Sequence, residues 1–79
     1  MKKTYEEYKK HVGYNIRLYR ELRKISVIGL ANALGLKNPL SVNNWERGIH
    51  MPDLGMVYKM SRILDVSIVD LLMEGVGGG

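Results

Sequence analysis

The chain has 79 residues, with 12 Lys or Arg against 8 Asp or Glu, which gives a formal net charge of +4. This length allows one domain, and a hydrophobic content of 46% is enough for one modest core but leaves little room for a buried substrate pocket. The absence of cysteine excludes disulfides, thiolate metal sites and cysteine nucleophiles. No apolar run is long enough to span a membrane, and no apolar secretory stretch follows the N-terminus, so we expect a cytoplasmic protein with no membrane partner.

The charge is unevenly distributed along the chain. Residues 1–40 carry nine basic and three acidic side chains, whereas residues 41–79 carry three basic and five acidic ones. Such a polarised charge in a small domain is typical of proteins that bind a polyanion such as nucleic acid. A solvated helix face that keeps the protein soluble explains the same imbalance, and charge alone does not decide between the two.

A long amphipathic helix is predicted from about residue 5 to about Lys24. Thr4 and Glu7 have the spacing of a capping box, in which each side chain accepts a hydrogen bond from the other residue's backbone N–H. Apolar residues then recur every three or four positions, as expected for one helix face. They are Tyr5, Tyr8, Val12, Ile16 and Tyr19. Leu18 and Leu22 lie off that face and either pack beneath the N-terminal turns or remain exposed; packing is the expectation.

Four shorter helices are predicted after it, from cap residues and helix breakers. Ser26 caps the second helix, which ends near Leu34 before Gly35. Asn38-Pro39 starts the third, with Asn38 as the cap and proline at the first helical position. Further signals are Gly48 as the stop of the third helix after about Arg47, Pro52-Asp53 as the start of the fourth, and a capping box at Ser67–Asp70 for a fifth running through about Met73.

The domain organisation follows from these helices. Because the sequence has no alternating strand pattern, repeat or internal linker, we predict an all-α protein with one domain over residues 1–74. Residues 75–79 are glycine-rich and are expected to form a flexible tail.

Little in the sequence indicates catalysis. His11 and His50 lie far apart and have no acidic or second histidine partner at metal-ligand spacing. No phosphate-binding glycine loop ends in Lys-Ser or Lys-Thr. We therefore expect no metal, cofactor or small-molecule ligand, and a protein that is not an enzyme.

Residues 26–48 meet the requirements of a helix-turn-helix. Two short helices that cross closely need a small residue at the crossing, which Ala31 provides, and a turn residue that tolerates positive φ, which Gly35 provides. Apolar residues must also hold the second helix on the first. The candidates are Leu30, Leu34, Leu36, Val42 and Trp45. In this motif, at about residues 26–47, the second helix enters the major groove of DNA.

Short motifs elsewhere in the chain point to a family. In chain order they are Val12-Gly13, Ile16 before Tyr19-Arg20, Ile25-Ser26, Leu30-Ala31, Gly35-Leu36, Trp45-Glu46-Arg47-Gly48, Pro52, Leu64-Asp65-Val66-Ser67 and Leu71-Leu72. With them the sequence resembles the Cro and lambda-repressor-like (XRE) family of helix-turn-helix DNA-binding domains over about residues 12–72. The resemblance implies a compact five-helix domain that needs no cofactor and binds double-stranded DNA, at a pseudo-palindromic operator, as a two-fold dimer. It also implies an ion pair between Arg20 and Glu46, and an arginine fork is the best partner for a glutamate beside a core tryptophan.

Counted back from Trp45, the base-reading positions of the family fall on Pro39, Leu40, Ser41 and Asn44. Leu40 can contact a thymine methyl group, and Ser41 and Asn44 can form hydrogen bonds with base edges. The Leu36–Trp45 spacing is one residue longer than is usual in the family, which brings Lys37 or Asn38 to the DNA as alternatives. The predicted base readers are therefore Leu40, Ser41, Asn44 and Asn38.

A second group of residues is expected at the phosphate backbone of the DNA. It consists of Arg23, Lys24, Val27, Lys37, Asn43, Arg47 and Gly48. Val27 stands where the family usually has a phosphate-contacting glutamine, so only backbone N–H groups remain for contact there. In the fifth helix Val69, Leu72 and Met73 either form the dimer contact, as often in the family, or simply close the core.

These features lead to two functional hypotheses. The first is a sequence-specific transcriptional regulator, expected to be a repressor, that acts as a homodimer, whether or not the dimer forms off DNA. The second is an antitoxin-like or accessory protein-interaction module with the same fold, because Val27, Pro39 and Leu40 are apolar where the family is usually polar.

Overall fold

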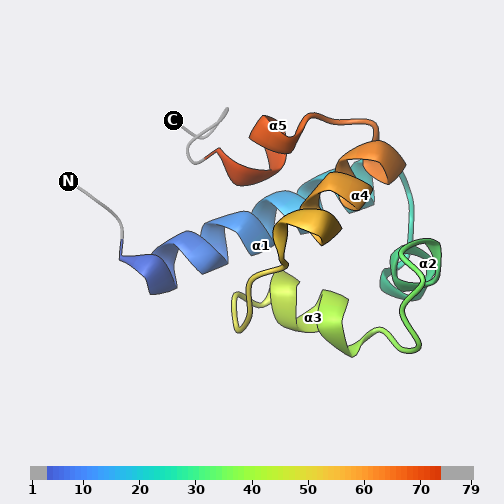
Figure 1. Ribbon diagram of the computed structural model, residues 1–79, viewed down its shortest axis with the longest axis horizontal. Helices are drawn as coiled ribbons and strands as arrows, with labels where there is room; N and C mark the ends of the chain where they lie inside the picture. The colour runs from blue at the N-terminus through green and yellow to red at the C-terminus, as the bar shows by residue number, and fades with distance from the viewer. Residues whose placement is uncertain (1–3, 74–79) are drawn as a thin grey trace.

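Five helices form along residues 4–73, which are the residues that the computed structural model describes, and this part of the chain contains no strand (Figure 1). They are α1 (Tyr5–Leu22), α2 (Val27–Ala33), α3 (Leu40–Glu46), α4 (Leu54–Leu64) and α5 (Ile68–Leu72). The expected all-α fold with five helices is thereby confirmed. The predicted tail, residues 75–79, and both ends of the predicted domain lie outside the described residues.

Three helices, α1, α2 and α5, begin at the capping residues that the sequence predicts. The Thr4–Glu7 capping box is present, with the Glu7 amide donating to Thr4 Oγ1 over 3.1 Å and the Thr4 amide donating to Glu7 Oε1 over 2.9 Å. Ser67 and Asp70 form a second capping box at the start of α5. Each such cap satisfies backbone N–H groups that have no partner within the helix.

Four helices end with a residue in the left-handed conformation. Lys24, Gly35, Gly48 and Asp65 follow α1, α2, α3 and α4 with φ of 58°, 78°, 73° and 56°. Each donates its amide back to the helix before it, and so does the next residue along the chain. The predicted extension of α1 to about Lys24 is wrong for this reason: the chain leaves the helical conformation there, and α1 stops at Leu22.

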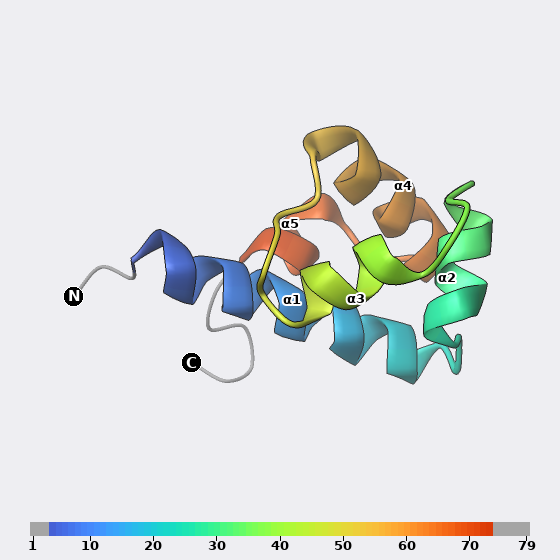
Figure 2. The same ribbon diagram turned by 90° about the horizontal axis from the view of Figure 1, so that it is seen from below.

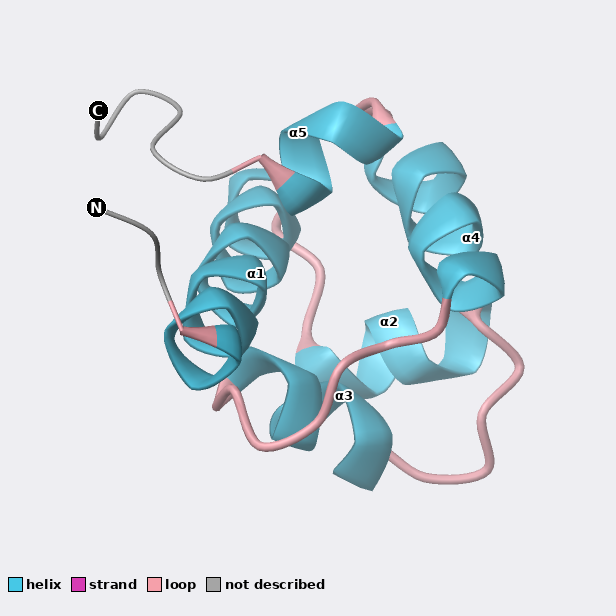
Figure 3. Cartoon of the chain, turned by 60° about the vertical axis from the view of Figure 1, so that its left-hand side comes forward, coloured by secondary structure: helices cyan, strands magenta, loops and turns pink. Residues whose placement is uncertain are grey.

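The core lies between the helices, which surround it on all sides in Figure 3. Its buried apolar side chains come from every helix and from the end of α2. They are Val12, Ile16, Leu30, Ala31, Leu34, Val42, Trp45, Val57, Met60, Leu64 and Leu71. α1 contacts both α3 and α5, which lie on either side of it in Figure 1, and Figure 2 shows α3 lying across α1.

The outer face of α1 departs from the expectation. Leu18 and Leu22 are exposed rather than packed, so the packing prediction is wrong. Both point away from the sides of α1 that contact α3 and α5, where the buried residues of this helix lie. Tyr5 also belongs to the predicted apolar face, but it is exposed at the end of α1, where the Lys9 ammonium lies 5.2 Å from its ring centre.

Candidate nucleic-acid interface

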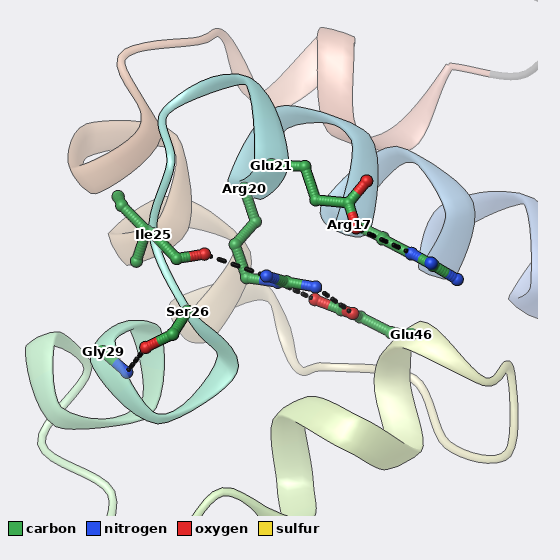
Figure 4. A network of polar contacts seen from close by, with 7 residues as sticks. All are labelled: Arg17, Arg20, Glu21, Ile25, Ser26, Gly29 and Glu46. Carbon is green, nitrogen blue, oxygen red and sulfur yellow. Dashed lines mark hydrogen bonds and ion pairs between the residues drawn. The ribbon is translucent and has the colours of Figure 1, made fainter.

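The turn between α2 and α3 is built from local hydrogen bonds. Ser26 caps α2, with its Oγ accepting from the Gly29 amide over 2.9 Å (Figure 4). Gly35 reverses the chain after α2, and Asn38 Oδ1 accepts from the Leu40 amide over 2.9 Å. α3 itself begins at Leu40, one residue later than predicted, with Pro39 in the cap position. Asn38 therefore still caps the first turn, although the helix is shorter.

Direct backbone contact holds α3 against α1. A Cβ atom on Gly13 would overlap the carbonyl oxygen of Trp45 and lie 2.8 Å from that of Glu46, so no larger residue fits there without moving one helix. Gly48 is equally close to α1, because a Cβ atom there would lie 2.8 Å from Lys10 Cα. The end of α3 and the turn after it are thus fixed by the backbone of α1.

A buried ion pair makes the second connection between α1 and α3. Arg20 Nε donates to Glu46 Oε2 over 2.6 Å, and Nη2 donates to Oε1 over 3.0 Å (Figure 4). The two side chains are only 11% and 8% exposed. Donation of hydrogen bonds to the Glu46 carboxylate raises the pKa of Arg20, although burial acts in the opposite direction. Nη1 also donates to the Ile25 carbonyl over 2.9 Å, so one guanidinium joins α1, α3 and the segment before α2.

The outward face of α3 carries the side chains that can meet a ligand. Val42 and Trp45 are buried, and a period of 3.6 residues places Leu40, Asn44 and Arg47 on the opposite side. Leu40 is 61% exposed and Arg47 is exposed, while Asn44 is half-buried. Of the other predicted residues, Ser41 is half-buried at the edge of this face, and Asn43 is exposed on it.

The predicted phosphate-contacting residues are divided between different surroundings. Lys24, Lys37 and Arg47 are exposed. Arg23 is held at the end of α4, where Nε donates to the Leu64 carbonyl over 2.9 Å and Nη2 to Asp65 Oδ2 over 3.2 Å. Its guanidinium therefore joins α1 to α4, and any phosphate contact would compete with this role.

Backbone groups at two predicted sites also differ in availability. Val27 is the first residue of α2, so its amide has no partner within the helix. The Gly48 amide, by contrast, donates to the Trp45 carbonyl over 3.0 Å. Contact with a ligand near Gly48 is thus left to the neighbouring side chains.

The sequence reasoning missed Lys10 as a residue of this surface. Lys10 is exposed and its backbone packs on Gly48, next to Arg47 at the end of α3. Its neighbour Lys9 donates to the Ile49 carbonyl over 3.2 Å in the same turn. No sequence motif signals this placement, because it depends on how close α1 comes to the segment after α3.

The third predicted group lies on α5, away from α3. Val69 and Met73 are exposed, and Leu72 is half-buried against the core. The carbonyl groups at the end of α5 accept hydrogen bonds from α1: Asn15 Nδ2 donates to the carbonyls of Leu71 (3.0 Å) and Met73 (3.1 Å). α1 therefore positions both α3 and α5.

Other kinds of site find no support in the described part of the chain. No three His, Asp or Glu side chains there come together to hold a metal ion. None of the helices in residues 4–73 combines the length and the apolar character needed to cross a membrane.

The short helices α2 and α3 are joined by a tight turn, and α3 is docked on the long helix α1 with one face outward. This arrangement defines a helix-turn-helix domain. The profile of the helix-turn-helix family HTH_3 matches residues 16–71, and the chain belongs to this family. The resemblance to XRE-type domains is thereby confirmed. No curated protein sequence matches the chain significantly.

Solved structures of several regulators share this fold. The hypothetical transcription factor NHTF from Neisseria is 27% identical with a TM-score of 0.80, over 95% of this chain and 85% of that one. The restriction-modification controller protein C.AhdI from Aeromonas hydrophila is 25% identical with a TM-score of 0.79, over 87% of this chain and 99% of that one. The clp gene regulator ClgR from Corynebacterium glutamicum, at 23% identity and a TM-score of 0.78 over 87% and 72%, shares the fold. The family and these neighbours indicate a DNA-binding regulator rather than an enzyme.

Proposed function

We propose that this protein is a sequence-specific transcriptional repressor that occupies a pseudo-palindromic operator as a homodimer, with α3 in the major groove. The observation that carries the proposal is the docking of α3: its inner side is fixed to α1 by Gly13 and by the Arg20–Glu46 pair, and its outer side is open. A recognition helix needs this combination, because base contacts discriminate only when their side chains are held in register.

Four residues are proposed to read bases. Leu40 and Asn44 lie on the outward face of α3, with Ser41 at its edge. Asn38 uses its Oδ1 to cap α3, so its NH₂ group supplies the donors for a base edge. These residues are uncharged, so discrimination between base pairs would come from hydrogen bonds and apolar contact.

The DNA backbone is proposed to contact a different set of groups. It comprises the side chains of Arg23, Lys24, Lys37, Asn43 and Arg47, the Val27 amide, the region of Gly48, and Lys10 beside it. Such contacts position a protein on DNA and make binding depend on salt. The logarithm of affinity should fall against the logarithm of salt concentration with a slope near −0.9 for each of about four to six phosphate contacts per protomer.

The dimer is proposed to form through α5. Val69 on α5 and Met73, which directly follows the helix, are both exposed, so two copies of this segment can bury them against each other around a two-fold axis. Changing both residues to glutamate should leave the fold intact and convert two-protomer occupancy of the operator to one-protomer occupancy. Sedimentation equilibrium of the complexes measures this, and unchanged occupancy would remove α5 from the interface.

Selection of bound duplexes from a random pool tests the function itself. The expected result is one enriched palindrome whose half-sites lie about 34–36 Å apart, one helical turn. The enriched duplex should bind more tightly than a scrambled one by fluorescence anisotropy at about 0.1 M salt, where phosphate contacts alone do not discriminate. Equal affinity for both duplexes would refute sequence-specific binding. Repression is tested with a reporter gene placed behind the enriched operator.

One observation favours the second candidate function, a protein-interaction module. Ile28 on α2 and Leu40 on α3 are each 61% exposed, and exposed apolar groups on a helix-turn-helix suit a protein partner. On this alternative the protein would enrich no duplex, and it would co-purify from its host with a defined second subunit. Purification of the homodimer alone would count against it.

A further inference from the structure

The chemistry of the outward face of α3 restricts which bases it can select. In B-DNA, cytosine presents an amino donor in the major groove and is best recognised by a carboxylate, whereas guanine presents two acceptors and is best recognised by Arg or Lys. Within α3, all of which the structure describes, the one carboxylate is Glu46, and it is turned inward onto Arg20. The cation Arg47 follows the last helical residue, at the far end of the face.

Leu40 supplies an apolar group to this face. It is 61% exposed, and its neighbour on the same face is the half-buried Asn44. The thymine C5-methyl group is the apolar feature that a base pair displays in the major groove. An exposed leucine on a recognition helix therefore matches thymine better than any other base.

Asn44 lies one turn further along the same face. Four residues of helix span about 6 Å, close to the rise of two base pairs. An asparagine amide can bond adenine at N6 and N7 together, because it offers an acceptor and a donor side by side. Leu40 and Asn44 are thus spaced to contact A·T pairs about two base-pair steps apart.

We propose that α3 selects A·T base pairs in each half-site, with Leu40 packed on a thymine methyl group and Asn44 bonded to an adenine. The proposal rests on the proposed function, and it adds the identity of the bases that the helix reads. It predicts that the half-site selected from a random pool has A·T pairs opposite α3.

Deoxyuridine provides the decisive probe, because it pairs like thymine and lacks only the methyl group. In the enriched duplex, each thymine of one half-site is replaced in turn by deoxyuridine, and affinity is measured by fluorescence anisotropy. One replacement should weaken binding of the wild-type protein about fourfold, the value expected for one buried methyl group. The same replacement should have no effect on the variant Leu40→Ala.

The chain offers a matched control for that variant. Ile28 is as exposed as Leu40 but lies on α2. Ile28→Ala should keep the full deoxyuridine effect, which separates contact by Leu40 from general loss of apolar surface. Circular dichroism melting curves of both variants should match the wild type, because neither side chain is buried.

Different failures have different meanings. If no duplex is enriched, the proposed function fails and this inference fails with it. If a palindrome is enriched but deoxyuridine weakens wild type and Leu40→Ala equally, or weakens neither, the function stands and the inference is overturned. An enriched half-site with only G·C pairs opposite α3 would overturn it as well.

Discussion

Removing one partner of the buried Arg20–Glu46 pair should lower the free energy of unfolding by a large fraction of its total. In Glu46→Ala the guanidinium stays buried, with one hydrogen bond to the Ile25 carbonyl left of the three that it makes in the wild type. Breaking a buried ion pair from one side costs about 3–5 kcal/mol. A domain of this size has a total stability of roughly 4–12 kcal/mol, at about 0.05–0.15 kcal/mol per residue. The variant should therefore lose at least about a quarter of its stability.

Urea denaturation followed by circular dichroism measures this loss, and the chain contains its own control. The ion pair between Arg17 and Glu21 joins side chains that are 64% and 55% exposed, on the same helix. Arg17→Ala should cost no more than about 0.5 kcal/mol, as is typical of an exposed pair one turn apart. A double variant with apolar residues, Arg20→Met with Glu46→Leu, should recover most of the stability, because no charge is then left buried.

The sign of the pH dependence follows from the raised pKa of Arg20. A group whose pKa is raised in the folded state contributes stability at every pH below its unfolded value and loses it only as pH rises through the folded value. For an arginine that range is strongly alkaline, so the cost of Glu46→Ala should be the same at pH 6.5 and at pH 8.5. If Glu46→Ala and Arg17→Ala cost the same, the pair does not act as a buried connection between α1 and α3.

Three further predictions concern single residues. Gly13→Ala should destabilise the protein by about 1–3 kcal/mol in urea denaturation and weaken DNA binding, because the new methyl group meets the backbone of α3. Gly55→Ala is the control: its methyl group would meet only the Asp53 side chain at 3.3 Å, so stability should change by less than about 1 kcal/mol. Lys24→Gly should raise the free energy of unfolding, and with it the melting temperature, by about 1 kcal/mol of stability, and Gly35→Ala should lower the free energy by a similar amount. The reason is that both positions have positive φ and only the residue type differs. Changes of the same sign in the two variants would contradict this. Asn44→Ala should cost about 1–3 kcal/mol of operator affinity and relax the preference at one base pair. Arg47→Ala should instead weaken binding to all duplexes alike and reduce the salt dependence by about one phosphate contact. Identical behaviour of the two variants would reassign Asn44 to the phosphate backbone.

The parts of the fold that the sequence predicts are those decided by neighbouring residues. The caps at Thr4, Ser26 and Ser67 follow from side chains and amides three residues apart, and all three are present. The end of α1 was not predictable in this way, because Lys24 takes a conformation that usually requires glycine. Nothing in its local sequence indicates this conformation.

In the candidate site, too, the sequence predicts the residues placed by local spacing but not those placed by the approach of two helices. Periodicity alone places Leu40 and Asn44 together on one face of a helix once the buried Trp45 is given. The role of Gly13 could not be predicted, because it depends on the distance between α1 and α3. The placement of Lys10 beside Gly48 depends on the same approach of the two segments.

The shortness of α3 makes these tertiary contacts decisive for function. A helix of seven residues is not stable alone, and α3 starts without a side-chain hydrogen bond from its own cap residue. Its position, and so the register of Leu40 and Asn44 on a base pair, is set by α1 through Gly13 and Arg20. Variants on α1 that touch no DNA should therefore impair discrimination between sequences as much as variants on α3 do. The net positive charge of the first half of the chain would then draw the protein to DNA in general, while uncharged side chains on a helix held by α1 would select the sequence.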